Sequence, residues 1–138
     1  MTMTRLFLAY TGALLTFVAL DLLWLGFVVK GYYQAQVGPL LLATPNWIAA
    51  ALLYLAYAGG IVFFVILPAL EAGSLARALG AGALFGLVVY GVYDLTNLAT
   101  LRGWTVGVAV ADILWGAAVT AAAAGAGFAV TRLAAAPS

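Results

Sequence analysis

Residues 106–130 read VGVAVADILWGAAVTAAAAGAGFAV, and Asp112 is the only charged residue among them. A helix needs about 20 consecutive apolar residues to cross a hydrocarbon core of about 30 Å, so this stretch is long enough to span a membrane. Three further stretches share this character, and we expect spanning helices at residues about 6–29, 47–70, 79–98 and 106–130. The sequence therefore predicts an all-α fold, in which residues 1–138 form a single four-transmembrane-helix bundle.

The composition excludes the common soluble classes. Hydrophobic residues make up 67% of the chain and charged residues only 7%, against about 25% charged residues in an ordinary soluble domain. The net charge of +1 provides no basic surface for nucleic acid. The chain contains no Cys and no His, which argues against disulfide, haem and the usual zinc chemistry. We therefore expect the lipid bilayer as the main partner, with no nucleic acid, no metal and no cofactor.

The basic residues indicate the orientation of the bundle. With four spans, both termini and the link between the second and third helices lie on one side of the membrane. That side holds Arg5, Arg77 and Arg132, whereas the other side holds Lys30 and Arg102. Because an excess of basic residues marks the cytoplasmic side, we expect both termini in the cytoplasm.

Two of the links between helices carry interpretable signals. Residues 30–46 contain two prolines and the pair Tyr32 and Tyr33. Amphipathic aromatic rings collect in the lipid headgroup zone, so we interpret this link as an interfacial loop rather than a functional lid. In the short link at residues 71–78, Ser74 is expected to cap the third helix.

Three of the four acidic residues, Asp21, Asp94 and Asp112, fall within the predicted spans. A charge there costs about 2.5–3.5 kcal/mol on insertion scales. At about 1.5 Å per residue, the three lie about 12 Å, at least about 6 Å and about 9 Å from the nearer helix end. These three ends are on one side, so the carboxyls are predicted to share one layer in the half of the membrane away from the termini, the periplasmic half.

The third helix presents a polar stripe and a small-residue stripe on one face. Tyr90, Asp94 and Asn97 follow the spacing i, i+4 and i+7. Gly82 and Gly86 continue this face with a small-xxx-small spacing, which lets another helix approach closely. We therefore predict that Asp94 points into the bundle. The Gly82/Gly86 stripe is also the surface through which a homo-oligomer or another membrane protein would pack.

Aromatic residues accompany the aspartates. Trp24 follows Asp21, and Trp115 follows Asp112, each at the spacing i, i+3. Carboxyl groups without matching internal Lys or Arg can bind a cation, and aromatic rings can stack on it. The predicted ligand-binding site comprises Asp21, Asp94, Asp112, Asn97, Tyr90, Trp24 and Trp115.

Three interpretations of this site stay open. The favoured one is binding or translocation of a small cationic or amphiphilic ligand, coupled to protons. A second is a membrane-embedded enzyme, or enzyme partner, that uses paired aspartates as acid and base on a lipid. No serine lies within the spans and no nucleophile motif is visible, so the residues favour a non-enzymatic role. A third is a structural role, as a hydrogen-bonded network or a helper subunit of a membrane complex.

Several of these motifs resemble those of a known family. The resemblance rests on Trp104 and on the segments DLLWLG (21–26), YDLTNLATL (93–101) and DILWG (112–116). They are similar to the predicted bacterial membrane proteins of domain-of-unknown-function family 2177, over nearly the whole chain. The resemblance implies a small four-helix protein of the bacterial inner membrane, without an established activity or catalytic residues. In architecture alone, the chain is also similar to small multidrug resistance exporters, which carry an acid in their first helix.

Overall fold

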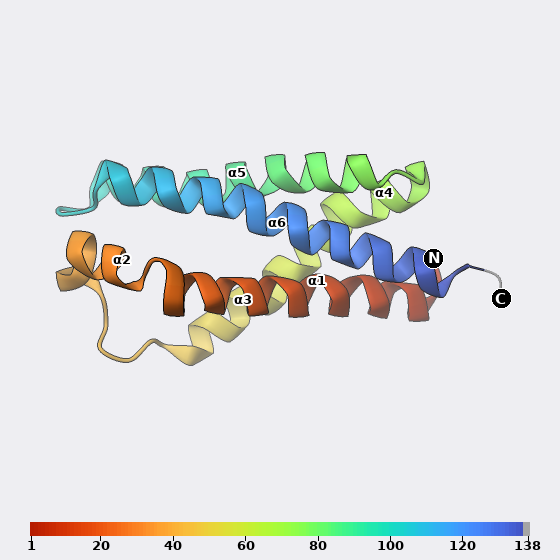
Figure 1. Cartoon of the computed structure of the whole chain (residues 1–138), viewed down its shortest axis with the longest axis horizontal. Helices are drawn as coiled ribbons and strands as arrows, with labels where there is room; N and C mark the ends of the chain where they lie inside the picture. The colour runs from red at the N-terminus through yellow and green to blue at the C-terminus, as the bar shows by residue number, and fades with distance from the viewer. Residues whose placement is uncertain (137–138) are drawn as a thin grey trace.

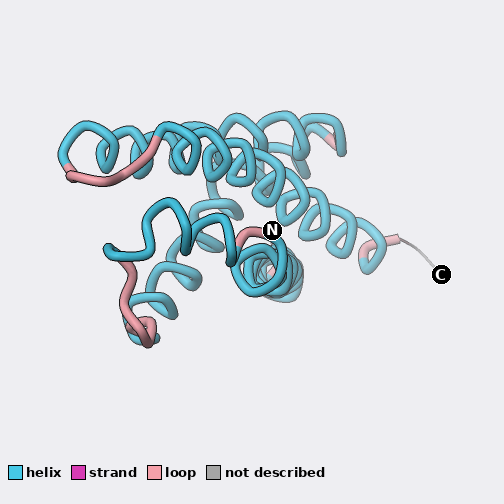
Figure 2. Tube along the Cα trace, turned by 60° about the vertical axis from the view of Figure 1, so that its left-hand side comes forward, coloured by secondary structure: helices cyan, strands magenta, loops and turns pink. Residues whose placement is uncertain are grey.

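The computed structural model describes residues 1–136, and most of these residues are helical (Figure 2). Within this range the chain contains no strand. The elements are α1 (Met3–Leu23), the π-helical turn η1 (Trp24–Val28), α2 (Lys30–Val37), the 3-10 turn η2 (Gly38–Leu40), α3 (Trp47–Ile61), the π-helical turn η3 (Val62–Ile66), α4 (Leu67–Ala72), α5 (Leu75–Thr100) and α6 (Val106–Ala134).

Four continuous helical segments are long and apolar enough to cross a membrane. They run over Met3–Val28, Trp47–Ala72, Leu75–Thr100 and Val106–Ala134. The all-α, four-span prediction is therefore confirmed. The third helix begins four residues earlier than predicted, and the fourth continues to Ala134.

Each span begins immediately after a short polar residue that caps it. The capping side chains and the backbone N–H groups that donate to them are Thr2 with Arg5 (3.3 Å), Asn46 with Ala49 (3.1 Å), Ser74 with Arg77 (3.1 Å) and Thr105 with Val108 (3.2 Å). A cap of this kind stabilises a helix by about 1 kcal/mol. The predicted cap at Ser74 is confirmed, and it explains the early start of α5.

Helix α6 is the centre of the bundle and packs against both α5 and α1 (Figure 1). Helix α3 contacts α1 and runs obliquely past it (Figure 1). The start of α1, the end of α6 and the turn between α4 and α5 lie at one end of the molecule, whereas α2 and the turn between α5 and α6 lie at the opposite end (Figure 1). The first span thus begins on the side of the bundle where the last span ends, as predicted.

The two glycines of the predicted stripe lie against the chain's own α6. A Cβ at Gly86 would clash with the backbone carbonyl of Gly116 and the Thr120 hydroxyl, and a Cβ at Gly82 would come within 3.1 Å of the Ala121 backbone. Both glycines are buried. The stripe is therefore a contact surface, as predicted, but the contact is internal. It offers no free surface to a second copy or another protein.

The interpretation of residues 30–46 as an interfacial loop is wrong for its first half. Residues 30–37 form α2, and only the segment after Leu40 is non-helical before α3 begins. Intrinsic propensity is a weak prior that tertiary contacts override. Here Val37 is buried, and Tyr33 reaches Asp112 of α6. These contacts hold α2 against the bundle.

The close approach of α5 to α6 leads to a stability prediction. Gly86→Ala should destabilise the folded protein by about 1–3 kcal/mol, because the added methyl overpacks the interface. Gly80→Ala on the same helix meets nothing within 4 Å, and it should be neutral or stabilising by up to about 1 kcal/mol. Thermal unfolding of both variants in one detergent measures the difference. Equal unfolding temperatures would contradict this packing.

Candidate functional site

A cavity of about 400 Å³ is lined by α2, by the second halves of α1 and α5, and by the first part of α6, which lie toward the end of the bundle that carries the α5–α6 turn (Figure 1). This volume is within the range of small-molecule sites, about 300–1,000 Å³. Its wall combines two carboxyl groups with six amphipathic aromatic side chains, namely Asp21, Asp112, Tyr33, Tyr54, Tyr57, Tyr90, Tyr93 and Trp104. No Lys or Arg of the described chain lines it. The cavity is therefore negatively polarised.

One side of the cavity is apolar and reaches the outer surface. Leu25 of η1, Leu41 after η2 and Leu53 of α3 line this side. Leu53 is 61% exposed and the other two are more than 40% exposed. Since α3 is a spanning helix, Leu53 faces lipid. The cavity thus joins an acidic interior to an apolar rim at the membrane.

Asp21 is held by donors from two other helices. Its carboxylate accepts a hydrogen bond from the Tyr54 hydroxyl of α3 at 2.7 Å and another from the Trp115 indole N–H of α6 at 3.1 Å. Each donor serves a different carboxylate oxygen. Hydrogen bonds to an ionised acceptor are stronger than neutral ones. This arrangement therefore satisfies both oxygens of Asp21, although only 7% of the residue is exposed.

Asp112 accepts a hydrogen bond from a residue that lies outside the membrane spans. The Tyr33 hydroxyl of α2 donates to it at 3.1 Å, and the Trp24 indole N–H donates to the same hydroxyl oxygen at 3.4 Å. Burial raises the pKa of Tyr33, and the nearby Asp112 carboxylate acts in the same direction. The hydroxyl therefore stays protonated and remains a donor at physiological pH.

The two tryptophans link both carboxyl systems. Their rings are stacked, with centroids 4.5 Å apart and an angle of 1° between the ring planes. Trp115 donates to Asp21, and Trp24 donates to Tyr33, the donor of Asp112. Neither ring lines the cavity. The tryptophan pair therefore orients Tyr33 and Asp21 without itself lining the cavity.

Asp94 lies behind the cavity wall and is 0% exposed. Within residues 1–136, neither of its carboxyl oxygens receives a hydrogen bond. The neighbouring polar side chains are Asp112 and Trp104, and the Trp104 indole N–H is itself buried without a partner in this part of the chain. Asp94 thus points into the bundle, as the face of α5 predicts.

The structure brings most of the predicted site residues together, but only some of them line the cavity. Asp21, Asp112 and Tyr90 line the cavity, and Asp94 lies behind Asp112. Trp24 and Trp115 are orienting residues, and Asn97 is a half-buried neighbour of Tyr93 outside the cavity lining. Ligand binding by these residues stays a prediction.

The predicted ligand-binding site leaves out four tyrosines that line the cavity, Tyr33, Tyr54, Tyr57 and Tyr93. Tyr54 and Tyr57 have the spacing i, i+3 within an otherwise apolar span. Such a pair of buried hydroxyls needs partners, and that need was an available signal. Tyr33 gave no such signal, because an interfacial tyrosine is an ordinary membrane anchor.

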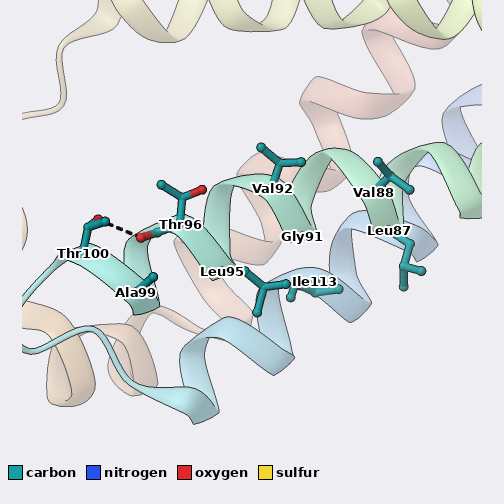
Figure 3. A pocket seen from close by; sticks show the side chains of 9 residues that line it. All are labelled: Leu87, Val88, Gly91, Val92, Leu95, Thr96, Ala99, Thr100 and Ile113. Carbon is teal, nitrogen blue, oxygen red and sulfur yellow. Dashed lines mark hydrogen bonds between the residues drawn. The ribbon is translucent and has the colours of Figure 1, made fainter.

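A second hollow, a groove of about 740 Å³, follows the outer face of α5 (Figure 3). Its lining is apolar apart from Thr96 and Thr100, and the Thr100 hydroxyl donates to the Thr96 backbone carbonyl at 2.7 Å. No charged residue lines it. The chemistry of this half of the molecule is therefore concentrated in the smaller, acidic cavity.

Comparison with known proteins gives one match. A family model described as "Predicted membrane protein (DUF2177)" matches residues 6–129. No curated protein and no solved structure matches the chain.

The hydrogen bond between Tyr54 and Asp21 leads to a second prediction. Tyr54→Phe leaves one oxygen of a buried carboxylate without its donor, and it should destabilise the protein by about 1–3 kcal/mol. The matched control is Tyr10→Phe, because the Tyr10 hydroxyl donates to the backbone carbonyl of Leu55 at an exposed position. The control should cost less than about 1 kcal/mol. Equal losses in denaturant unfolding would show that Asp21 does not depend on this donor.

Proposed function

The chain belongs to the DUF2177 family of predicted membrane proteins, a family of unknown function, and we propose that it binds a small cationic or amphiphilic ligand in the cavity at Asp21 and Asp112. Binding is coupled to protons and serves recognition or translocation. The family membership supports a multi-pass membrane protein. The nature of the ligand is inferred from the chemistry of the cavity alone.

The observation that carries this proposal is the pair of carboxyls in a cavity wall that contains no Lys or Arg. Charge in a membrane interior is costly unless it is paired or functional. A monovalent cation in the cavity would balance the charge of one carboxylate. The faces of the surrounding tyrosines and Trp104 add cation–π attraction, worth about 2 kcal/mol or more when desolvated.

The apolar rim supports an amphiphile over an inorganic ion. Leu25, Leu41 and Leu53 connect the cavity to the lipid-facing surface. Ligand pockets are mainly apolar with a few polar groups that fix orientation. A ligand with an apolar body and one cationic group therefore matches both parts of the wall, and it can enter laterally from the bilayer.

The distribution of basic residues supports an orientation. Arg5, Arg77 and Arg132 lie at the end with the termini, and Lys30 and Arg102 lie at the end near the cavity. By the positive-inside rule, the termini are cytoplasmic and the cavity lies in the periplasmic half of a bacterial inner membrane.

Acid–base chemistry on a lipid is the second candidate, and the lipid-facing rim is the observation that favours it. Incubation of the purified protein with a lipid extract, followed by mass spectrometry, tests it. A product formed by the native protein and not by Asp21→Asn would establish the enzyme and overturn the binding role as the primary function.

A matched pair of probes tests the proposed function. Tetraphenylphosphonium and tetraphenylborate have nearly the same shape and opposite charge. Purified protein in phosphatidylcholine nanodiscs should bind the cation saturably and should not bind the anion above the level of empty nanodiscs. The double variant Asp21→Asn, Asp112→Asn should weaken cation binding by at least about tenfold, equivalent to about 1.4 kcal/mol.

The control variant is Glu71→Gln, which neutralises an exposed carboxylate near the α4–α5 turn, at the opposite end of the bundle. It should bind the cation as the native protein does. Equal binding of the cation and the anion, or full cation binding by the double variant, would overturn the proposal.

A further inference from the structure

We propose that Asp94 and Asp112 together hold one exchangeable proton, and that this proton leaves when the cationic ligand enters the cavity. The inference rests on the proposed function and assigns its proton coupling to one pair of side chains. Asp112 lines the cavity, whereas Asp94 is fully buried and does not line it. The ligand therefore meets only one member of the pair.

The packing of α5 against α6 places these two carboxyls at one level of the bundle. A Cβ at Gly116 of α6 would meet the Tyr90 ring of α5. Asp94 lies one turn beyond Tyr90 and Asp112 lies one turn before Gly116, so the two carboxyl groups face each other across the helix contact. An ionised carboxyl group is an acceptor only, so two carboxylates cannot form a hydrogen bond unless one of them is protonated. Asp94 is 0% exposed, and neither of its oxygens accepts a hydrogen bond within residues 1–136. A proton between the two groups satisfies both.

The surroundings supply no positive charge that could replace this proton. The polar and titratable groups that line the cavity with Asp112 are Asp21 from α1, Tyr33 from α2, Tyr54 and Tyr57 from α3, Tyr90 and Tyr93 from α5, and Trp104 from the turn before α6. All are neutral except Asp21, which is negative when ionised and makes a second charge on the pair less favourable. The surroundings of the pair thus favour retention of one proton.

Asp21 contrasts with this pair. Its two oxygens accept from Tyr54 and Trp115, so it has the donors that an ionised carboxylate needs. The cavity therefore combines Asp21, whose two oxygens already have donors, with a pair whose charge changes when its proton leaves. Entry of a monovalent cation balances the additional charge of the pair, and the proton passes to water at the α2 end of the bundle.

Proton release upon binding tests this inference. Native protein in phosphatidylcholine nanodiscs is mixed with tetraphenylphosphonium in weakly buffered solution that contains a pH indicator. We expect release of about one proton per cation bound, and about tenfold tighter binding for each pH unit of increase over the range in which the pair holds its proton. Infrared difference spectra should show loss of a protonated-carboxyl C=O band on binding.

Asp94→Asn separates the switch from the binding site. The amide can donate to Asp112, so the variant should bind the cation without proton release and with an affinity independent of pH. Glu71→Gln is the control and should release the proton as the native protein does.

The outcomes distinguish this inference from the proposed function. If the native protein binds the cation without releasing a proton or losing the C=O band, the inference is overturned and the proposed function stands. Undiminished release from Asp94→Asn would also overturn it. If the cation does not bind at any pH, both are overturned. The two measurements on native protein remain decisive even if Asp94→Asn does not fold.

Discussion

The arrangement of this molecule depends on one constraint: three carboxyl groups lie within its apolar spans, and no Lys or Arg lines the cavity beside them. Unpaired charge in such surroundings is expensive, so the chain must compensate it by hydrogen bonds, by protonation or by a bound cation. Asp21 has two strong donors, Asp112 has one, and Asp94 has none within the described residues. The three carboxyl groups therefore differ in the number of hydrogen-bond donors that they have, and this difference gives each group a different role.

The same hydrogen bonds hold the helices in register. Tyr54 connects α3 to α1, Trp115 connects α6 to α1, and Tyr33 connects α2 to α6. In the first half of α5, the small residues Gly82 and Gly86 bring the backbones of α5 and α6 into contact. Apolar packing provides little preference between helices in lipid, so these polar contacts and close approaches select one arrangement of the bundle.

Much of this structure follows from the sequence. Hydropathy alone predicts the four spans, since only a helix satisfies its own backbone in lipid. Because the number of spans is even, the first span begins on the side of the membrane where the last span ends. The spacing of Tyr90, Asp94 and Gly86 identifies the buried face of α5. The helix α2 and the donor Tyr33 were not predictable in the same way. Their conformation depends on Asp112, which lies far along the chain, and periodicity within one segment does not show which helices become neighbours.

Crystallography with a bound cation tests the role of the cavity most directly. Tetraphenylarsonium has nearly the shape and the same charge as tetraphenylphosphonium, and arsenic gives an anomalous X-ray signal. In crystals grown with this cation, we expect an arsenic peak between Asp21 and Asp112, inside the cavity. A peak in the apolar groove on α5, or none within the bundle, would contradict the claim that unpaired carboxyls make this cavity a cation site.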